Sequence, residues 1–409
     1  MKSVVIIGGG AAGLLAALGA AENGAAVTIL EKNDIVGKKM GITGKGRCNL
    51  TNICSVPELI ENTPGNGRFL FSVYKQFDNQ DLIAMLHSWG LETKVERGGR
   101  VFPCSDSAIE VRKAFYHRLR QLGVTIQLNE KVLSIKKEAD RFIISCKNGV
   151  YEAEACIIAT GGMSYPGTGS TGDGYEFAKA FGHRVTALRP ALVPLTSDDA
   201  LIPEMQGLSL KNVELAVYRK NKEIYRRFGE MLFTHFGISG PIVLSASGAV
   251  SGCKAEEFPL RASIDLKPAL TKEKLDERML RDFQKYSRKH MENALQEMLP
   301  RKMIGPVLKK SGIAPEKTVN QLTKDERKQL IDMIKGFAFT ITGTRPIAEA
   351  IVTAGGVVTK EIQPATMESK LVSGLYFAGE VLDIDGYTGG YNLQAAFSTG
   401  YAAGKDAAL

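Results

Sequence analysis

The sequence lacks the patterns that tie a chain to a membrane or to an oxidising compartment. It contains no run of 18 consecutive apolar residues, and its apolar N-terminal stretch has no signal-peptide cleavage pattern. Its six cysteines are scattered, and no two of them form a C-x-x-C pair. That scatter argues against a disulfide framework and against a structural zinc site. We therefore expect a cytoplasmic protein without a membrane span.

Internal repeats and long linkers are absent as well. The 409 residues are 44% hydrophobic, which provides for a large core and predicts two or three structural units. The net charge is +8 and the isoelectric point is near 9.0. This charge suits a polyanionic partner such as RNA, but many basic proteins have no such partner. Charge alone leaves the partner open.

The N-terminus carries the pattern of a dinucleotide-binding unit. An apolar strand leads into a G-x-G-x-x-G turn formed by Gly8, Gly10 and Gly13, and a helix and a second strand come after it. Gly8 allows the tight turn, Gly10 lets the backbone approach a pyrophosphate, and Gly13 lets the helix pack on the strand. Glu31 ends the second strand, where an acid accepts hydrogen bonds from a ribose. The motif predicts a dinucleotide but does not distinguish NAD from FAD.

Two later segments favour FAD. A buried strand at 156–160 ends in Gly161-Gly162, a turn of the kind that approaches FAD in flavoproteins with two dinucleotide folds. A strand at 375–380 leads to Asp383 and then to a helix start at 389–396, whose backbone N–H groups suit the flavin and the pyrophosphate. Markers near residues 10, 160 and 380 are the layout of glutathione-reductase-type flavoproteins. The marker near residue 380 is not expected in a simple NAD dehydrogenase.

A second G-x-G-x-x-G occurs at 167–172, and we do not interpret it as a nicotinamide site. It comes after a proline-containing loop rather than a strand, and the next strand ends in Arg189-Pro190 without a ribose-binding acid. It resembles the loop and helix start beside the flavin in fumarate-reductase-like enzymes. Reduction by NAD(P)H would then need only transient docking.

The pattern of apolar residues predicts the order of the parts. The first dinucleotide domain covers 1–190, a β-rich insertion 191–270, a charged helical insertion 271–335, and the return of the first domain 336–409. Within the first part, the periodicity predicts helices at 78–90, 107–122 and about 174–181, and strands at 124–128, 132–136, 142–146, 151–155 and 156–160.

Long motifs lie at 37–52, 99–103, 160–174, 234–241 and 389–394. With these motifs the chain resembles the BaiN/RdsA (YhiN-like) family of FAD-dependent oxidoreductases, and the resemblance spans the whole chain. It implies an α/β fold, in which a Rossmann-like FAD domain is interrupted by a β-barrel-like module with a helical subdomain. It also implies reduction of an activated C=C bond, in a uridine of large-subunit rRNA or in a bile-acid dienone.

The motifs and the resemblance together give a set of expected FAD contacts. NAD(P)H is the expected transient electron donor. The expected contacts are Gly8, Gly10, Ala11, Ala12, Gly13, Glu31, Lys32, Lys38, Lys39, Gly46, Arg47, Cys48, Asn49, Val132, Thr160, Gly161, Gly162, Gly379, Glu380, Asp383, Gly390, Tyr391, Asn392, Leu393 and Gln394.

Reduction of an enone-like bond needs a proton donor for the α-carbon. Cys48 and His235 are our catalytic candidates, with Cys104 and Tyr391 considered beside them. Cys48 lies in a glycine- and cation-rich loop that would keep a thiol reactive, although it could equally pack beneath that loop. His235 lies in a loop of the insertion that could face the flavin, or it could be structural.

Cations favour RNA as the substrate, because a small sterol needs none of them, although many will be solvated surface charges. The expected function is therefore reduction of an rRNA uridine to dihydrouridine. The alternatives are an enone reductase for a sterol-like molecule and a flavin-bearing RNA- or ribosome-binding protein without turnover. The cations are Lys38, Lys39, Lys45 and Arg47; Arg219, Lys220, Lys222, Arg226 and Arg227; and Arg281, Lys285, Arg288, Lys289, His290, Arg301, Lys302, Lys309 and Lys310.

Overall fold

A computed structural model describes residues 1–409, and the chain divides into two compact units. Unit 1 comprises Met1–Ala191 and Ile347–Leu409, and unit 2 comprises Leu192–Pro346. Each unit has its own cluster of buried apolar side chains. None of the helices is both long enough and apolar enough to cross a bilayer.

Unit 1 is built on a parallel five-stranded sheet in the order β20-β10-β1-β2-β6. Its central strands are continuous apolar runs because helices cover a parallel sheet on both faces. The strands are β1 (Ser3–Ile7), β2 (Ala26–Leu30), β6 (Thr125–Gln127), β10 (Ala155–Ile158) and β20 (Leu375–Phe377). The helices are α1 (Ala11–Glu22), α2 (Thr43–Gly46), α3 (Val56–Glu61), α4 (Phe71–Tyr74), α5 (Asn79–Ser88), α6 (Ala108–Gln121), α7 (Asp173–Ala180) and α13 (Tyr391–Ala407).

Three small antiparallel sheets complete unit 1. One of them, β3-β5-β4, lies beside the loop at 37–52, and another, β11-β19, forms where the chain leaves the unit and returns to it. The strands are β3 (Thr51–Asn52), β4 (Thr93–Glu96) and β5 (Arg100–Pro103); β7 (Val132–Glu138), β8 (Arg141–Cys146) and β9 (Val150–Ala153); and β11 (Arg189–Ala191) and β19 (Val352–Ala354).

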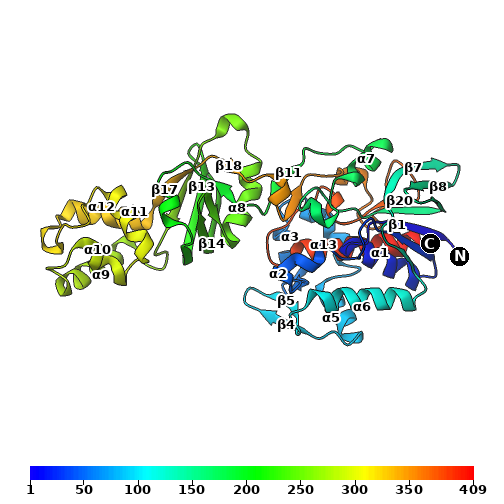
Figure 1. Cartoon of the computed structure of the whole chain (residues 1–409), viewed down its shortest axis with the longest axis horizontal. Coiled ribbons are helices and arrows are strands. Elements are labelled where there is room, and N and C mark those ends of the chain that lie inside the picture. The colour runs from blue at the N-terminus through cyan, green and yellow to red at the C-terminus, as the bar shows by residue number, and fades with distance from the viewer. The chain divides into compact units, whose positions relative to one another are not determined.

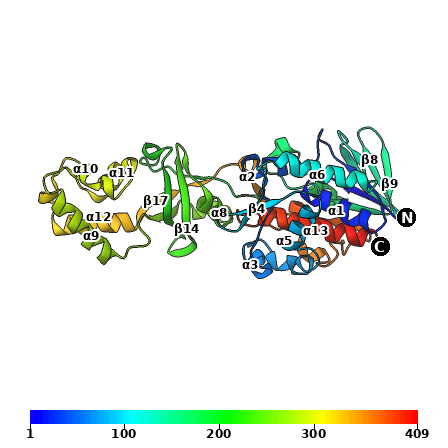
Figure 2. The same cartoon turned by 90° about the horizontal axis from the view of Figure 1, so that it is seen from below.

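Helices α1 and α13 pack against each other along their length, and both views show them side by side (Figures 1 and 2). Small residues make the contact possible. A Cβ atom added to Gly400 would lie 2.1 Å from the carbonyl oxygen of Ala12, and one added to Gly404 would lie 1.9 Å from that of Ala16. The backbones therefore touch, and the C-terminal helix holds the first helix in place.

Unit 2 contains a seven-stranded antiparallel sheet in the order β17-β16-β13-β14-β15-β12-β18. Its edge strands β17 and β18 are separated in the chain by Thr342 alone, so the sheet must curve to bring its two edges near each other there. The strands are β12 (Leu195–Thr196), β13 (Ser209–Arg219), β14 (Lys222–Thr234), β15 (Gly237–Ser239), β16 (Leu260–Asp265), β17 (Phe337–Ile341) and β18 (Gly343–Thr344). The helices are α8 (Pro241–Ser251), α9 (Lys272–Lys285), α10 (Met291–Ala294), α11 (Arg301–Ser311) and α12 (Lys324–Lys335).

The boundary expected at 336 differs from the structure, in which unit 1 resumes at Ile347. Strands β17 and β18 come after the helical insertion but belong to the sheet of unit 2, because β17 pairs with β16 and β18 pairs with β12. The short strands carry no sign in the sequence of which sheet they join. Pairing partners decide that, and they are distant in the chain.

Replacing Gly404 by alanine tests the backbone contact between α1 and α13. The added methyl overlaps the Ala16 carbonyl, so the helices must separate, and we expect a loss of about 1–3 kcal/mol in unfolding free energy. Urea unfolding followed by circular dichroism measures it. The control is Gly248→Ala in α8, where the methyl meets nothing within 4 Å and should stabilise the helix by about 0.5–1 kcal/mol. Equal effects of the two substitutions would contradict the contact.

Candidate functional site

The carboxyl ends of β1 and β10 form the centre of the candidate site. These parallel strands are neighbours, although the chain passes first from β1 to β2 on the other side. The strand order therefore reverses here, and open α/β sheets bind ligands at such a point. The turns after the two strands meet, because a Cβ atom on Gly8 would lie 2.6 Å from the carbonyl oxygen of Ala159. The structure thus brings the first two sequence markers together.

The N-terminus of α1 is open at this point. Its N-cap is Gly10, no side chain caps it, and its first turn holds no acid. A Cβ atom on Gly10 would meet nothing within 4 Å, whereas one on Gly13 would lie 1.9 Å from the carbonyl oxygen of Gly8. Gly13 is thus needed for packing, and Gly10 leaves space. Unpaired N–H groups and the positive end of the helix dipole suit the phosphates of a dinucleotide.

A second uncapped helix start lies close by. Helix α13 begins after Gly390, which takes φ = 98°, and its first turn has neither a side-chain cap nor an acid. A Cβ atom on Gly390 would lie 2.3 Å from the carbonyl oxygen of Thr51, so the loop at 37–52 ends against this terminus. Gly379, just past β20, packs on the first turn of α1, since its Cβ would lie 2.8 Å from that of Ala12. All three markers and the loop therefore surround one region.

The segment after β2 forms the other end of the site. One carboxylate oxygen of Glu31 accepts a hydrogen bond from the Gly9 N–H at 2.7 Å, and the other accepts two from Asn33. The side-chain amide of Asn33 also donates to the carbonyl of Thr168, and Lys32 forms an ion pair of 2.6 Å with Asp173. The glycine-rich loop at 167–172 thus packs on this segment. Glu130 joins Glu31 through the backbone, which places Val132 nearby.

A polar network connects the loop at 37–52 with the third marker. The Lys39 ammonium lies 2.8 Å from Glu380 and donates to the Ser164 hydroxyl at 2.7 Å. The other oxygen of Glu380 accepts from Ser164 and from the Thr353 N–H, each at 2.9 Å. Lys39 and Glu380 were both expected to touch FAD, and they are paired with each other. The remaining donor capacity of the Lys39 ammonium is available to a ligand.

The structure corrects three expectations about side chains. Cys48 is fully buried, and burial raises the pKa of its thiol to about 12, so it is neither reactive nor accessible to a substrate. Gln394 is fully buried, with its amide bonded to Thr51 and Ser398. Arg47 lies 2.6 Å from Glu96 and stacks on the ring of Phe102, so it braces the loop rather than offering its charge.

The other residues expected to contact FAD differ in their exposure and in their hydrogen bonds. Lys38 makes a long hydrogen bond of 3.4 Å to Asn33, and Lys45, beside Gly46, is exposed without a partner. The Asn392 amide is bonded to the backbone of Gly386 and Tyr387, which supports the loop before α13. With its amide oriented to satisfy both neighbours, Asn49 bonds Thr51 and Gly390 in the same region. Gly161 and Gly162 form the turn after β10, where a Cβ on Gly162 would meet Thr353 and Glu380, and Leu393 lies in the first turn of α13.

The other proton-donor candidates occupy different places. His235 is exposed in the turn between β14 and β15 of unit 2. Cys104 is exposed at the end of β5. Tyr391 begins α13 and its ring lies against Gly389. His235 belongs to unit 2, whereas Cys104 and Tyr391 belong to unit 1 and do not contact each other.

Asp385 is a functional candidate that sequence reasoning missed. It lies between Asp383 and the start of α13, and its carboxyl occupies space that a side chain at position 65 would fill, since a Cβ on Gly65 would lie 2.1 Å from it. Burial and the nearby Asp383 carboxylate raise the pKa of Asp385 to about 6, while Arg189 opposes the shift. A carboxyl with this pKa can hold and release a proton near neutrality. The motif Asp-x-Asp-Gly was the one available signal.

Comparison with known proteins gives a consistent result. Residues 2–406 match the family described as HI0933-like protein Rossmann domain. The chain belongs to this family. The resemblance argued from the motifs is thereby confirmed, and so is the Rossmann-type α/β fold class.

Two curated relatives and one solved structure are similar to the chain. A protein named ribosomal RNA dihydrouridine synthase from Haemophilus influenzae is 33% identical, covering 97% of this chain and 96% of the relative. A protein named 3-dehydro-bile acid delta(4,6)-reductase from Clostridium scindens is 34% identical, covering 100% and 99%. The structure of 3-ketosteroid delta1-dehydrogenase from Sterolibacterium denitrificans is similar with a TM-score of 0.53 and 13% identity, covering 100% of both chains, and shows likeness of fold alone.

Alkylation tests the burial of Cys48. With iodoacetamide under native conditions, we expect the exposed thiol of Cys104 to be modified and that of Cys48 to remain free, because it is buried and protonated. Mass spectrometry of peptides measures both sites, and the protein unfolded in urea provides the control in which both react. Modification of the two thiols at equal rates in the native protein would contradict the assignment.

Asp385→Asn should make unit 1 more stable at neutral pH. The folded-state pKa near 6 lies above the unfolded value, so the stability that the protonated carboxyl contributes is fully present below about pH 4 and is lost as the pH rises past 6. The amide does not ionise, so the cost of ionising the buried carboxyl is avoided, and this is worth up to about 3 kcal/mol of unfolding free energy at pH 7.5. Thermal unfolding at pH 4 and 7.5 measures this. Asp406→Asn, which removes a carboxylate that accepts from Tyr376, should not show the gain.

Proposed function

We propose that the protein is an FAD-dependent oxidoreductase that reduces an activated C=C bond, and that its substrate is a uridine of large-subunit rRNA. The single observation that carries the cofactor is the meeting of two uncapped helix N-termini at the reversal point of the sheet. Unpaired N–H groups there suit the pyrophosphate and the flavin carbonyl oxygen. Bound FAD, once reduced, supplies a hydride.

The residues of unit 1 fit an FAD molecule in its usual orientation. The turn from Gly8 to Gly13 would hold the pyrophosphate, and the Glu31 carboxylate retains an acceptor position for the adenosine ribose. Asp383 would bond the ribityl chain, and the N-terminus of α13 would face the flavin oxygen. NAD(P)H is the proposed electron donor. The loop at 167–172 packs on the segment after β2, so it does not form a second dinucleotide domain. This supports transient docking of the donor.

Names of relatives support both the C=C chemistry and two substrate classes. The relatives named for rRNA dihydrouridine and for a bile acid are 33% and 34% identical to the chain, so identity favours neither. The two reactions share their chemistry, since each adds a hydride to the β-carbon and a proton to the α-carbon of a conjugated carbonyl. The exposed cations of unit 2 favour RNA, because a steroid has little use for them. Reduction of a sterol-like enone is therefore the second candidate.

Asp385 is our candidate for the proton donor, with His235 of unit 2 as the alternative. In the proposal the Asp385 carboxyl gives its proton to the α-carbon as the hydride arrives at the β-carbon. General acids of this kind contribute about 10²–10⁴-fold to a rate. Asp385 is half-enclosed and close to Asp383 and the α13 terminus, and its proton is held up to about pH 6.

Separate half-reactions test the proton donor. We expect Asp385→Asn to leave reduction of the flavin by NAD(P)H unchanged and to slow reoxidation by substrate at least about 100-fold. In the wild type this second step should fall as the pH rises above about 6, since the acid must be protonated. Stopped-flow absorbance of the flavin monitors both steps. The same loss in His235→Asn, with Asp385→Asn unaffected, would assign the role to His235.

Loss of the gene tests the substrate. If the proposal holds, rRNA from a deletion strain lacks a dihydrouridine that the parent contains, and the wild-type gene restores it. Chemical mapping and mass spectrometry of the large-subunit rRNA detect the change. An unchanged dihydrouridine content would reject the RNA substrate. Turnover of a conjugated steroid dienone by the purified FAD-loaded protein, without turnover of rRNA, would select the second candidate.

A further inference from the structure

Several basic side chains of unit 2 are already paired with acids of the same unit. Lys309 lies 2.8 Å from Glu204, and Lys310 lies 2.6 Å from Asp199. Arg226 has two acidic partners, Glu214 and Glu223, at 2.5 and 2.6 Å. A cation held in this way offers little net charge to a partner, because its field is cancelled nearby. The cations that matter for RNA are those left without an acid.

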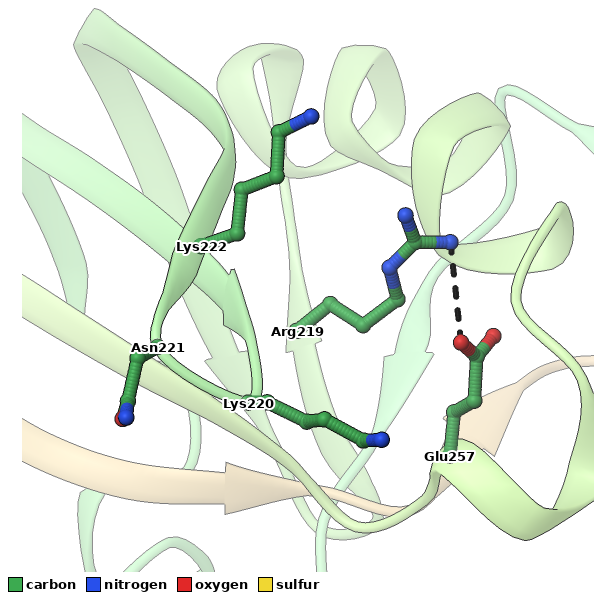
Figure 3. Close-up of a pocket in the computed structure, with 5 residues that line it drawn as sticks. All are labelled: Arg219, Lys220, Asn221, Lys222 and Glu257. Carbon is green, nitrogen blue, oxygen red and sulfur yellow. Dashed lines mark ion pairs between the residues drawn. The ribbon is translucent and has the colours of Figure 1, made fainter.

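The tip of the hairpin between β13 and β14 holds a group of such cations around one hollow. Lys220 and Lys222 are exposed and form no ion pair, and Arg219 reaches only Glu257, at 3.6 Å. Figure 3 shows that Lys220, Lys222 and Arg219 surround a shallow hollow, with Glu257 on one side of it and Asn221 pointing away. Three positive groups thus share a single partly engaged acid.

The turn at the hairpin tip has a lysine, Lys220, in a backbone conformation that lysine rarely adopts. Arg219 pairs with Lys222, so Lys220 and Asn221 form a two-residue turn. Lys220 takes φ = 55°, a conformation that glycine and asparagine adopt more readily than lysine. Such a residue is slightly strained, and strain retained at an exposed site is a reason to look for a function. Here the strained residue carries an unpaired ammonium group.

Aromatic side chains lie beside these cations on the same sheet. The guanidinium of Arg261 stacks on the ring of Tyr218 at 4.1 Å, and these two residues pair across β16 and β13 next to Arg219. Further along β14, Phe228 is 55% exposed. Cations and rings on one sheet suit a single-stranded nucleic acid, which presents phosphates and bases together. The acids at this end are Glu257, the exposed Glu256, and Glu223, which Arg226 engages.

We propose that this hairpin tip, comprising Arg219, Lys220 and Lys222, binds the phosphodiester backbone of the RNA substrate. The inference rests on the proposed function and names the surface that holds the RNA. Arg219 and the two lysines would neutralise phosphates, while the Arg261–Tyr218 stack and Phe228 would contact bases. An anionic membrane is the less fitting partner, since Phe228 is the one large apolar side chain exposed on this sheet.

The double variant Lys220→Asn/Lys222→Gln tests the proposal. Asparagine accepts the left-handed backbone at position 220, so the turn is kept while two charges are removed. The control is Lys324→Gln/Lys328→Gln on α12, which removes two exposed and unpaired charges elsewhere in unit 2. Binding of a large-subunit rRNA fragment to each FAD-loaded protein is measured from 0.05 to about 0.3 M salt. Circular dichroism and flavin content confirm that both variants are folded.

We expect the hairpin variant to reduce the slope of log affinity against log salt by roughly 1.4–1.8, which weakens binding roughly twentyfold at 0.15 M salt. The control should keep the wild-type slope. Equal slopes in all three proteins, or equal losses in the two variants, would overturn the proposal. Loss of binding to phosphatidylglycerol vesicles, with RNA binding unchanged, would assign the tip to a membrane and also overturn it.

Dihydrouridine formation, measured in parallel, separates this inference from the proposed function. If the wild type reduces the RNA and the hairpin variant keeps its salt slope, the hairpin inference alone fails. If the wild type binds RNA through the hairpin without reducing it, the proposed function fails and the hairpin inference stands.

Discussion

The backbone contact between α1 and α13 is the constraint on which the candidate site depends. Gly400 and Gly404 allow the C-terminal helix to lie directly on the carbonyl groups of Ala12 and Ala16, and Gly19 returns the contact against Tyr401. Helices that bear larger side chains remain about 8–10 Å apart. The closeness sets the distance between the two helix starts that face the dinucleotide region, so residues from opposite ends of the chain serve one site.

The long insertion between the two parts of unit 1 makes this contact necessary. Leu192–Pro346 fold as a separate unit with its own core, and the chain then returns to add β20 and α13. The packing of α13 on α1 fixes the position of the α13 N-terminus. A binding site requires such positions to within about 0.5 Å. The Lys39–Glu380 pair supports the same placement, since it ties the loop at 37–52 to the turn after β20.

Electrostatics divide the molecule into groups that brace the fold and groups that remain available. Arg47, Arg226, Lys309 and Lys310 are engaged by acids of their own unit. The lysines of the hairpin tip remain unpaired and solvated, whereas burial of Asp385 carries a desolvation cost that raises its pKa. Groups of this kind are the ones to examine first for a role in binding or catalysis.

Elements that depend on local pattern could be predicted from the sequence. The strand–turn–helix at Gly8–Gly13, the strand ending near Thr160 and the helix within 107–122 correspond to β1 with α1, to β10, and to α6. These depend on periodicity and on turn chemistry, which neighbouring residues carry. The boundary near 336 could not be predicted, because β17 and β18 belong to unit 2 only through pairing with distant strands.

The sequence by itself determined the fold class and the order of the parts, because glycine turns, apolar strands and long family motifs are local properties. Tertiary structure alone decided which side chains are available. The glycine- and cation-rich loop around Cys48 predicts a reactive thiol, yet this thiol is buried. No local pattern marks Asp385, yet its carboxyl has a raised pKa. Burial and charge depend on residues brought from elsewhere in the chain, and no pattern of neighbours records them.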